Sequence, residues 1–149
     1  MSQAARIALV AKLVFQDDSQ KSDLLNEQLT STNLIAALTS LVDAGHHIEV
    51  TAVRSDHHDD GPGPGLHAGG YAVDCWPLAD ATPGNYLDPG TQAFRDFLAA
   101  CAKAPDRMQV GLGGAAYSAA NVAATGLSLD DASVFHDDDE DHVHLGVTA

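Results

Sequence analysis

The segment that most constrains the fold of this chain is residues 55–70, which reads SDHHDDGPGPGLHAGG. Glycine and proline alternate through its centre, and both interrupt helices and strands. The flanking residues 47–53 and 71–76 are rich in apolar and β-branched side chains, which is typical of strands. We therefore expect a long loop between two strands, with His57 and His58 solvated. Long loops in compact domains are commonly functional, and this one is rich in histidine and aspartate.

Two segments have the pattern of amphipathic helices. Residues 33–44 repeat leucine at helical spacing directly after the candidate N-caps Ser31 and Thr32. The second helix begins after Thr91, places aromatic and apolar residues on one face, and closes before Pro105. Both helices have an apolar face that must be buried against other elements.

The other expected elements are mostly short strands. They cover residues 108–112, 134–135 and 142–147, in addition to 47–53 and to 71–76, which ends at Pro77. The small residues of 115–124 favour a further helix, and residues 7–15 are apolar on all sides, so a strand and a buried helix both stay open. The order of elements predicts an α+β fold, a single small domain with a largely antiparallel sheet and two main helices packed on it.

Length and charge exclude several classes of protein. A chain of 149 residues has room for one domain with one modest core. Its net charge of −14 repels polyphosphate, so we expect no nucleic-acid partner. Lys12 interrupts the first apolar stretch, and no cleavage site follows it. No apolar run approaches the ~20 residues of a membrane-spanning helix. We therefore expect no signal peptide, no membrane insertion and a cytoplasmic start.

Histidine is concentrated beside acidic residues in two parts of the chain. His142 and His144 lie on a predicted strand, where residues i and i+2 project to one face. In the other part, His67 is followed by Asp74, with a glycine pair between them that can supply a turn. Imidazole nitrogen and carboxylate oxygen are both ligands of zinc. The pattern indicates a zinc site, and solvated or hydrogen-bonded histidines are the alternative.

Three segments, taken in order, form a recognisable signature. They are residues 53–55 (VRS), 66–74 (LHAGGYAVD) and 141–144 (DHVH). Together they resemble the D-alanyl-D-alanine peptidase and hedgehog-type superfamily of zinc enzymes, and most of all a phage endolysin domain. Its signature is an arginine ending a strand, then S-x-H-x-x-G-x-A-x-D, then an acidic residue three positions before a last histidine. Gly65 stands where that pattern has serine. The fit covers about residues 33–147 of a single domain and leaves 1–32 as an N-terminal extension.

The resemblance implies a metal centre and a general base. His67, Asp74 and His144 are expected to bind Zn²⁺, with water as the fourth ligand. Such a set leaves one coordination position open, as in catalytic zinc sites. Asp141, three positions before the last histidine, is expected to take the proton of the attacking water, and Glu140 is the alternative base.

Two further residues complete the implied catalytic set. His142 is expected to face the same cleft and to assist the tetrahedral intermediate or to act as the base itself. Arg54, at the end of a strand, is expected to stabilise the developing oxyanion or to bind a substrate carbonyl. The alternative for Arg54 is a surface salt bridge to Asp56, Asp59 or Asp60.

The resemblance also implies an activity. We expect a zinc metallopeptidase that cleaves a peptidoglycan stem peptide, as an L-alanyl-D-glutamate endopeptidase or as a D-Ala-D-Ala carboxypeptidase. We expect such a protein in the host cytoplasm, released by a holin, or in a virion. The alternative is a phage structural or binding protein that keeps the fold without catalysis. The sequence gives no indication of the oligomeric state.

Overall fold

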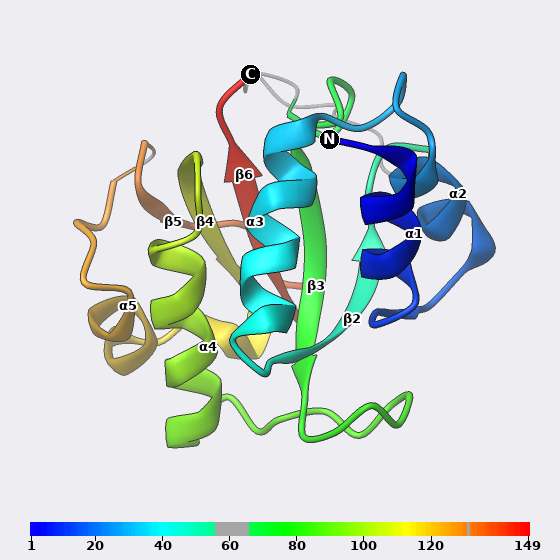
Figure 1. Ribbon diagram of the computed structural model, residues 1–149. Helices are drawn as coiled ribbons and strands as arrows, with labels where there is room; N and C mark the ends of the chain where they lie inside the picture. Colours follow the sequence, from blue (N-terminus) through cyan, green and yellow to red (C-terminus); the bar gives the residue numbers. More distant parts are fainter. Residues whose placement is uncertain (56–65, 131) are drawn as a thin grey trace.

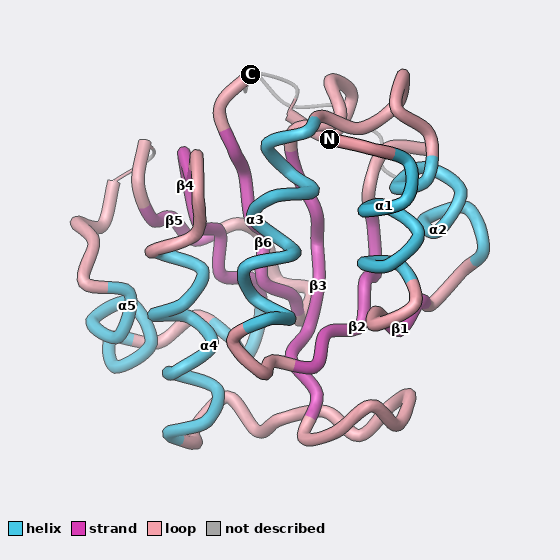
Figure 2. The backbone as a smooth tube through the Cα atoms, in the orientation of Figure 1, coloured by secondary structure: helices cyan, strands magenta, loops and turns pink. Residues whose placement is uncertain are grey.

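The computed structural model describes residues 1–55, 66–130 and 132–149. The helices in these residues are α1 (Gln3–Val10), α2 (Asp18–Leu25), α3 (Thr32–Asp43), α4 (Gln92–Ala102) and α5 (Ala119–Thr125). The strands are β1 (Val14–Phe15), β2 (His47–Ala52), β3 (Ala72–Leu78), β4 (Arg107–Gly113), β5 (Val134–His136) and β6 (His142–Val147), and a 3-10 turn, η1 (Gly114–Ala116), follows β4. Figure 1 shows how the helices pack against the sheet, and Figure 2 also labels the short strand β1.

The strands form one six-stranded sheet in the order β1-β2-β3-β6-β4-β5. The three central pairs, β2 with β3, β3 with β6 and β6 with β4, are antiparallel. The two outer pairs, β1 with β2 and β4 with β5, are parallel. The predicted α+β class with a largely antiparallel sheet is therefore confirmed. The last strand in the sequence, β6, lies at the centre of the sheet.

The two predicted helices are present and are the longest described, with three shorter helices beside them. Ser31 caps α3, because its hydroxyl accepts a hydrogen bond from the Leu34 N–H at 3.1 Å. Thr91 caps α4 in the same way, with the Phe94 N–H at 3.3 Å. The buried faces of both helices contribute to the main hydrophobic core.

Helices and sheet form two layers, and the sheet uses its two faces differently. In Figure 2, α3 and α4 lie across one face. The side chains of Val73, Cys75, Val143 and Leu145 are fully buried in the core with the helices. The residues between them in β3 and β6 project to the opposite face, because side chains alternate along a strand. Two of the predicted ligands, Asp74 and His144, are among these alternate residues.

Strand β3 is longer than the sequence predicts. We expected it to end at Pro77, but it continues through Pro77 to Leu78 and pairs with β2 along that length. Proline has no N–H and interrupts a strand that has neighbours on both sides. Here β6 pairs with β3 only as far as Cys75, so Pro77 lies where β3 has a strand partner on one side only.

Residues 7–15, which the sequence left open between helix and strand, divide between the end of α1 and the short strand β1. Arg6 of α1 is 1% exposed, and its guanidinium donates to the Leu24 carbonyl, the Thr30 hydroxyl and the Thr30 carbonyl at 2.7–2.8 Å. These contacts join α1 to the end of α2 and to the segment that follows it. In the described ranges, no helix combines the length and apolar character required to cross a lipid bilayer.

Candidate metal centre

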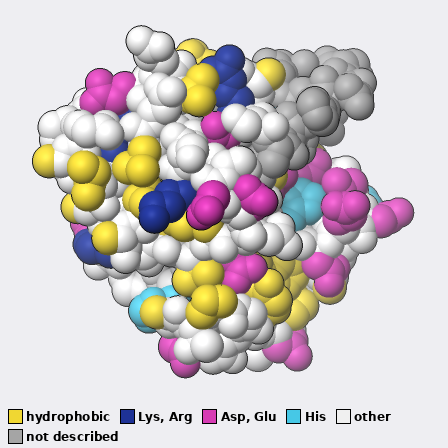
Figure 3. All heavy atoms as spheres, turned by 90° about the vertical axis from the view of Figure 1, so that its right-hand side faces the viewer, with side chains coloured by type: hydrophobic (Ala, Val, Ile, Leu, Met, Phe, Trp, Pro, Cys, Tyr) yellow, Lys and Arg dark blue, Asp and Glu magenta, His cyan; other side chains and the backbone are white. Residues whose placement is uncertain are grey.

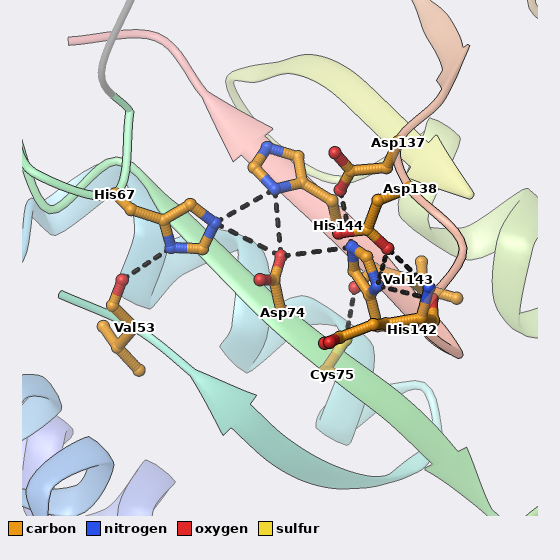
Figure 4. A network of polar contacts seen from close by, with 10 residues as sticks. Val53, His67, Asp74, Cys75, Asp137, Asp138, His142, Val143 and His144 are labelled. Atoms are coloured by element: carbon orange, nitrogen blue, oxygen red, sulfur yellow. Dashed lines mark hydrogen bonds and ion pairs between the residues drawn. The ribbon is translucent and has the colours of Figure 1, made fainter. Parts of the chain in front are cut away.

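Three predicted ligands meet on the sheet face that points away from α3 and α4. The antiparallel register places Asp74 of β3 directly opposite His144 of β6. His67 reaches them from the turn before β3, and Figure 4 shows the three side chains pointing toward one another. The distances are 3.2 Å from His67 Nε2 to Asp74 Oδ1, 3.1 Å from His67 Nε2 to His144 Nδ1, and 3.0 Å from His144 Nδ1 to Asp74 Oδ1. All three residues are buried.

The turn that presents His67 depends on a glycine. Gly70 has a left-handed φ of +73°, and its N–H donates to the His67 carbonyl at 2.8 Å. A Cβ at this position would overlap the Leu29 carbonyl of the N-terminal segment. Glycine is therefore required both for the backbone conformation and for the close approach of that segment.

The tautomer of His67 is set by its second nitrogen. Nδ1 lies 2.6 Å from the Val53 carbonyl, which can only accept a hydrogen bond, so Nδ1 carries the proton. In the neutral ring, Nε2 then carries a lone pair that points at Asp74 and His144. Histidine ligands of metals commonly donate their other N–H in this way, which fixes the ring orientation.

The donor set fits a small dication. Bonds of about 2.0–2.1 Å in tetrahedral geometry place ligand atoms about 3.3 Å apart, close to the separations in this cluster. Burial would raise the pKa of Asp74, but the hydrogen bond from His144 and the nearby His67 ring outweigh it and lower the pKa well below its usual range. The carboxylate is therefore anionic. His67, Asp74 and His144 could hold a metal ion.

Two glycines in β4 leave room for the histidine rings of β6. Gly111 pairs with His144, and a Cβ there would lie 2.8 Å from the His144 Cβ. Gly113 pairs with His142, and a Cβ there would lie 2.5 Å from the His142 ring. Both spacings are below van der Waals contact, so side chains at these positions would displace the rings. No local sequence pattern marks these glycines as part of the site.

His142 is held by acidic groups beside the cluster. Its Nδ1 lies 2.9 Å from the Glu140 carbonyl and its Nε2 lies 2.5 Å from Asp137 Oδ2, so both nitrogens face acceptors. Burial would lower the pKa of His142, but the hydrogen bond to Asp137 and the charge of Asp74 outweigh it and raise the pKa to about 9. In the metal-free protein His142 is therefore an imidazolium at neutral pH.

Asp137 is the functional candidate that the sequence did not identify. It is the first of five consecutive acidic residues, 137–141. Burial would raise the pKa of Asp137, but its hydrogen bond with His142 and the nearby His144 lower it. Together with Asp74 and His142 it forms a second group of possible metal ligands. Nothing in the acidic run distinguishes Asp137 from its neighbours. The geometry of the turn is what places its carboxylate beside His142.

The predicted bases Asp141 and Glu140 lie at the edge of the cluster. Asp141 is exposed, and its Oδ1 accepts a hydrogen bond from the Ala115 N–H at 2.7 Å. Both acids line a cavity of about 320 Å³ together with Asp74 and His142. Asp141 therefore shares an open space with one predicted ligand, although its carboxylate is not part of the buried cluster itself.

Arg54 lies near the centre through its backbone. Its N–H donates to Asp23 Oδ2 at 3.0 Å, and its side chain is half-buried. Within residues 1–55, 66–130 and 132–149, its guanidinium contacts none of the three candidate ligands. The alternative partners Asp56, Asp59 and Asp60 lie outside the described residues, as do His57, His58 and Gly65.

Comparisons with protein families, with curated proteins and with solved structures find no match for this chain. The site provides two imidazole nitrogens and one carboxylate oxygen in a buried triangle. It also provides a protonated imidazole and several carboxylates around an adjoining cavity.

Proposed function

We propose that this chain is a zinc-dependent peptidase whose metal is held by His67, Asp74 and His144. The observation that carries the proposal is the buried triangle of two imidazole nitrogens and one carboxylate oxygen, with all separations between 3.0 and 3.2 Å. Three protein ligands of this kind leave a coordination position open, which distinguishes catalytic zinc sites from structural ones. The adjoining cavity gives a substrate access to one of the ligands, Asp74.

A zinc ion bound there supplies a Lewis acid that polarises a carbonyl oxygen. The acid–base chemistry then belongs to the chain. Asp141 is exposed and lines the cavity. Its Oδ1 accepts a hydrogen bond from the Ala115 N–H, which leaves its other carboxylate oxygen to accept a proton. Both ring nitrogens of His142 face acceptors, so neither offers the lone pair that a base needs. Arg54 remains the candidate for binding a substrate carbonyl.

The charge of the cleft favours one cleavage type. Asp141 lines both the cavity at the metal centre and a second cavity of about 410 Å³ that includes Trp76 and Tyr86. The described residues lining these two cavities include acids and no lysine or arginine. In Figure 3, acidic side chains gather around histidine on one side of the face, while the visible lysine and arginine side chains lie elsewhere.

An acidic cleft repels a free carboxylate, because like charges at short range are unfavourable. A carboxypeptidase has to bind the C-terminal carboxylate of its substrate, whereas an endopeptidase cuts between residues further along the chain. We therefore propose the endopeptidase reaction on a peptidoglycan stem peptide, of the L-alanyl-D-glutamate type with the α-carboxylate of the D-glutamate amidated, over the D-Ala-D-Ala carboxypeptidase reaction.

The experiment that tests the proposal has two measurements. The first is metal content by plasma mass spectrometry for the wild type, for His144→Ala and for the matched control His47→Ala, an exposed histidine at the start of β2. We expect near-stoichiometric zinc in the wild type and the control and its loss in His144→Ala. Absence of zinc in the wild type, even after zinc addition, would contradict the metal centre.

The second measurement is cleavage of stem peptides, followed by mass spectrometry of the products. We expect zinc-dependent cleavage at the L-Ala–D-Glu bond and none at a terminal D-Ala–D-Ala bond. Cleavage only at the terminal bond would overturn the endopeptidase assignment. Bound zinc without cleavage of either peptide would favour a non-catalytic binding protein that keeps the site.

A further inference from the structure

A buried carboxylate outside the predicted signature is connected to the metal centre. Asp23 of α2 is 1% exposed. Its Oδ2 accepts hydrogen bonds from the N–H groups of Arg54 and Ser55 at 3.0 and 2.7 Å, and its Oδ1 accepts one from the Ser55 hydroxyl at 2.5 Å. A carboxylate is rarely this buried without a cation, and hydrogen bonds to backbone N–H groups are the usual compensation.

The contact with Arg54 has a direct consequence for His67. The Arg54 N–H and the Val53 carbonyl belong to the same peptide group, which is planar and rigid. Asp23 holds the N–H side of that plane, and the carbonyl side accepts the hydrogen bond from His67 Nδ1 at 2.6 Å. The position of the Asp23 carboxylate therefore determines where the Val53 carbonyl points.

The same arrangement polarises the acceptor. A negative charge on the N–H side of a peptide group strengthens its carbonyl as an acceptor, because hydrogen bonds in a chain polarise one another. A stronger acceptor holds the proton of His67 on Nδ1 and makes Nε2 a better electron donor. This is the effect that a carboxylate has on a metal-bound histidine when it contacts the ring directly.

We infer that Asp23 is a positioning residue for the metal ligand His67, acting through the Val53–Arg54 peptide group. The inference rests on the proposed metal centre and extends that centre into the N-terminal segment, which the sequence indicated only as an extension. Asp23 is itself fixed, since the Thr30 hydroxyl donates to its carbonyl at 3.0 Å and accepts from the buried Arg6 at 2.7 Å.

The same segment also holds the other side of the His67 turn. The Ser31 N–H donates to the Gly70 carbonyl at 2.9 Å, and the Leu29 backbone occupies the space that a side chain at position 70 would fill. His67 therefore lies between two contacts made by the N-terminal segment. Of these two contacts, the one from Asp23 sets the orientation of the imidazole through the Val53–Arg54 peptide group.

The test compares Asp23→Ala with two matched controls. Ser55→Ala removes one hydrogen bond to Asp23 without touching the Val53–Arg54 peptide group. Leu24→Ala removes a fully buried neighbour and destabilises the same helix through packing alone. For each variant, zinc affinity is measured by competition with a chromophoric chelator at a temperature where circular dichroism shows that the variant is folded.

We expect Asp23→Ala to bind zinc about 10–100-fold more weakly, the range typical for loss of an outer hydrogen-bond partner of a ligand. Ser55→Ala and Leu24→Ala should stay within about twofold of the wild type. Neither removes the hydrogen bond from the Arg54 N–H to Asp23 or the one from His67 to the Val53 carbonyl. Equal loss of affinity in Leu24→Ala and Asp23→Ala would overturn the inference, because general destabilisation would then be the cause.

A second readout does not depend on the metal. In metal-free protein, ¹⁵N chemical shifts of the His67 ring report which nitrogen is protonated. We expect the Nδ1–H form in the wild type and a mixture of tautomers in Asp23→Ala. An identical tautomer population in the two proteins would refute the positioning role. This comparison stays decisive if the wild type fails to bind zinc, a result that would overturn the proposed function.

Discussion

The substitution Gly111→Ala tests whether the glycines of β4 are required by the proposed metal centre. The added Cβ would lie 2.8 Å from the His144 Cβ and 2.9 Å from the Phe135 Cζ, where ordinary contact begins at 3.4 Å. The gap to His144 must therefore open from 2.8 to 3.4 Å. Metal–ligand distances tolerate only about 0.2 Å. Even if the β4 backbone takes half of this displacement, the remaining shift of His144 exceeds that tolerance.

The expected energies follow from the same contacts. Overpacking of this kind costs about 1–3 kcal/mol, against a gain of about 0.4–1 kcal/mol from the smaller entropy of an unfolded chain with alanine. Each net kcal/mol lowers the Tm by roughly 2–4 °C for a chain of this size. We therefore expect a modest fall in the Tm of the metal-free protein and a larger loss of zinc affinity, at least about 10-fold.

The assay is thermal unfolding of the metal-free protein together with zinc competition titration. Gly90→Ala is the matched control, because Gly90 is exposed and a Cβ there meets only the Asp88 carboxylate, at 3.1 Å. Wild-type Tm and wild-type zinc affinity in Gly111→Ala would refute the argument that the missing side chain makes room for His144.

Three further predictions follow from named contacts. Because the pKa of His142 is raised from 6.5 to about 9, its contribution to the stability of the metal-free protein is fully present below pH 6.5 and is lost as the pH rises through about 9. Urea unfolding at pH 6 and pH 10 should show this loss in the wild type and little of it in Asp137→Asn. Arg6→Ala leaves the carbonyls of two residues without their donor, so its free energy of unfolding should fall by at least about 2 kcal/mol in urea titrations, and a change under about 0.5 kcal/mol would contradict the buried contacts. Asp141→Ala should keep stoichiometric zinc by mass spectrometry but lose stem-peptide cleavage, and cleavage that survives would exclude Asp141 as the base.

The helices were predictable because their signals are local. A capping hydroxyl and apolar side chains at helical spacing act within one or two turns, so Ser31 and Thr91 mark α3 and α4 without knowledge of the rest of the chain. The end of β3 was not predictable in this way. Pro77 normally ends a strand, and only the length of the β6 partner decides whether its missing N–H matters.

Part of the candidate metal centre was also readable from the sequence. The spacing of His142 and His144 places both rings on one face of a strand, and the glycine pair before Asp74 allows a turn to bring His67 back to it. Gly111 and Gly113 have the same two-residue spacing as the histidines. Their role became apparent only when the sheet register set each glycine opposite a ring.

The sequence by itself determined the α+β class, the two main helices and the residue types that can bind a metal, because each depends on side-chain chemistry or short-range periodicity. Only the tertiary structure decided that β6 lies between β3 and β4, that the carboxylate of Asp137 hydrogen-bonds His142, and that Asp23 holds the peptide group whose carbonyl contacts His67. These contacts join residues that are distant in sequence or selected by a turn, and no local pattern encodes which partner will be within 3 Å.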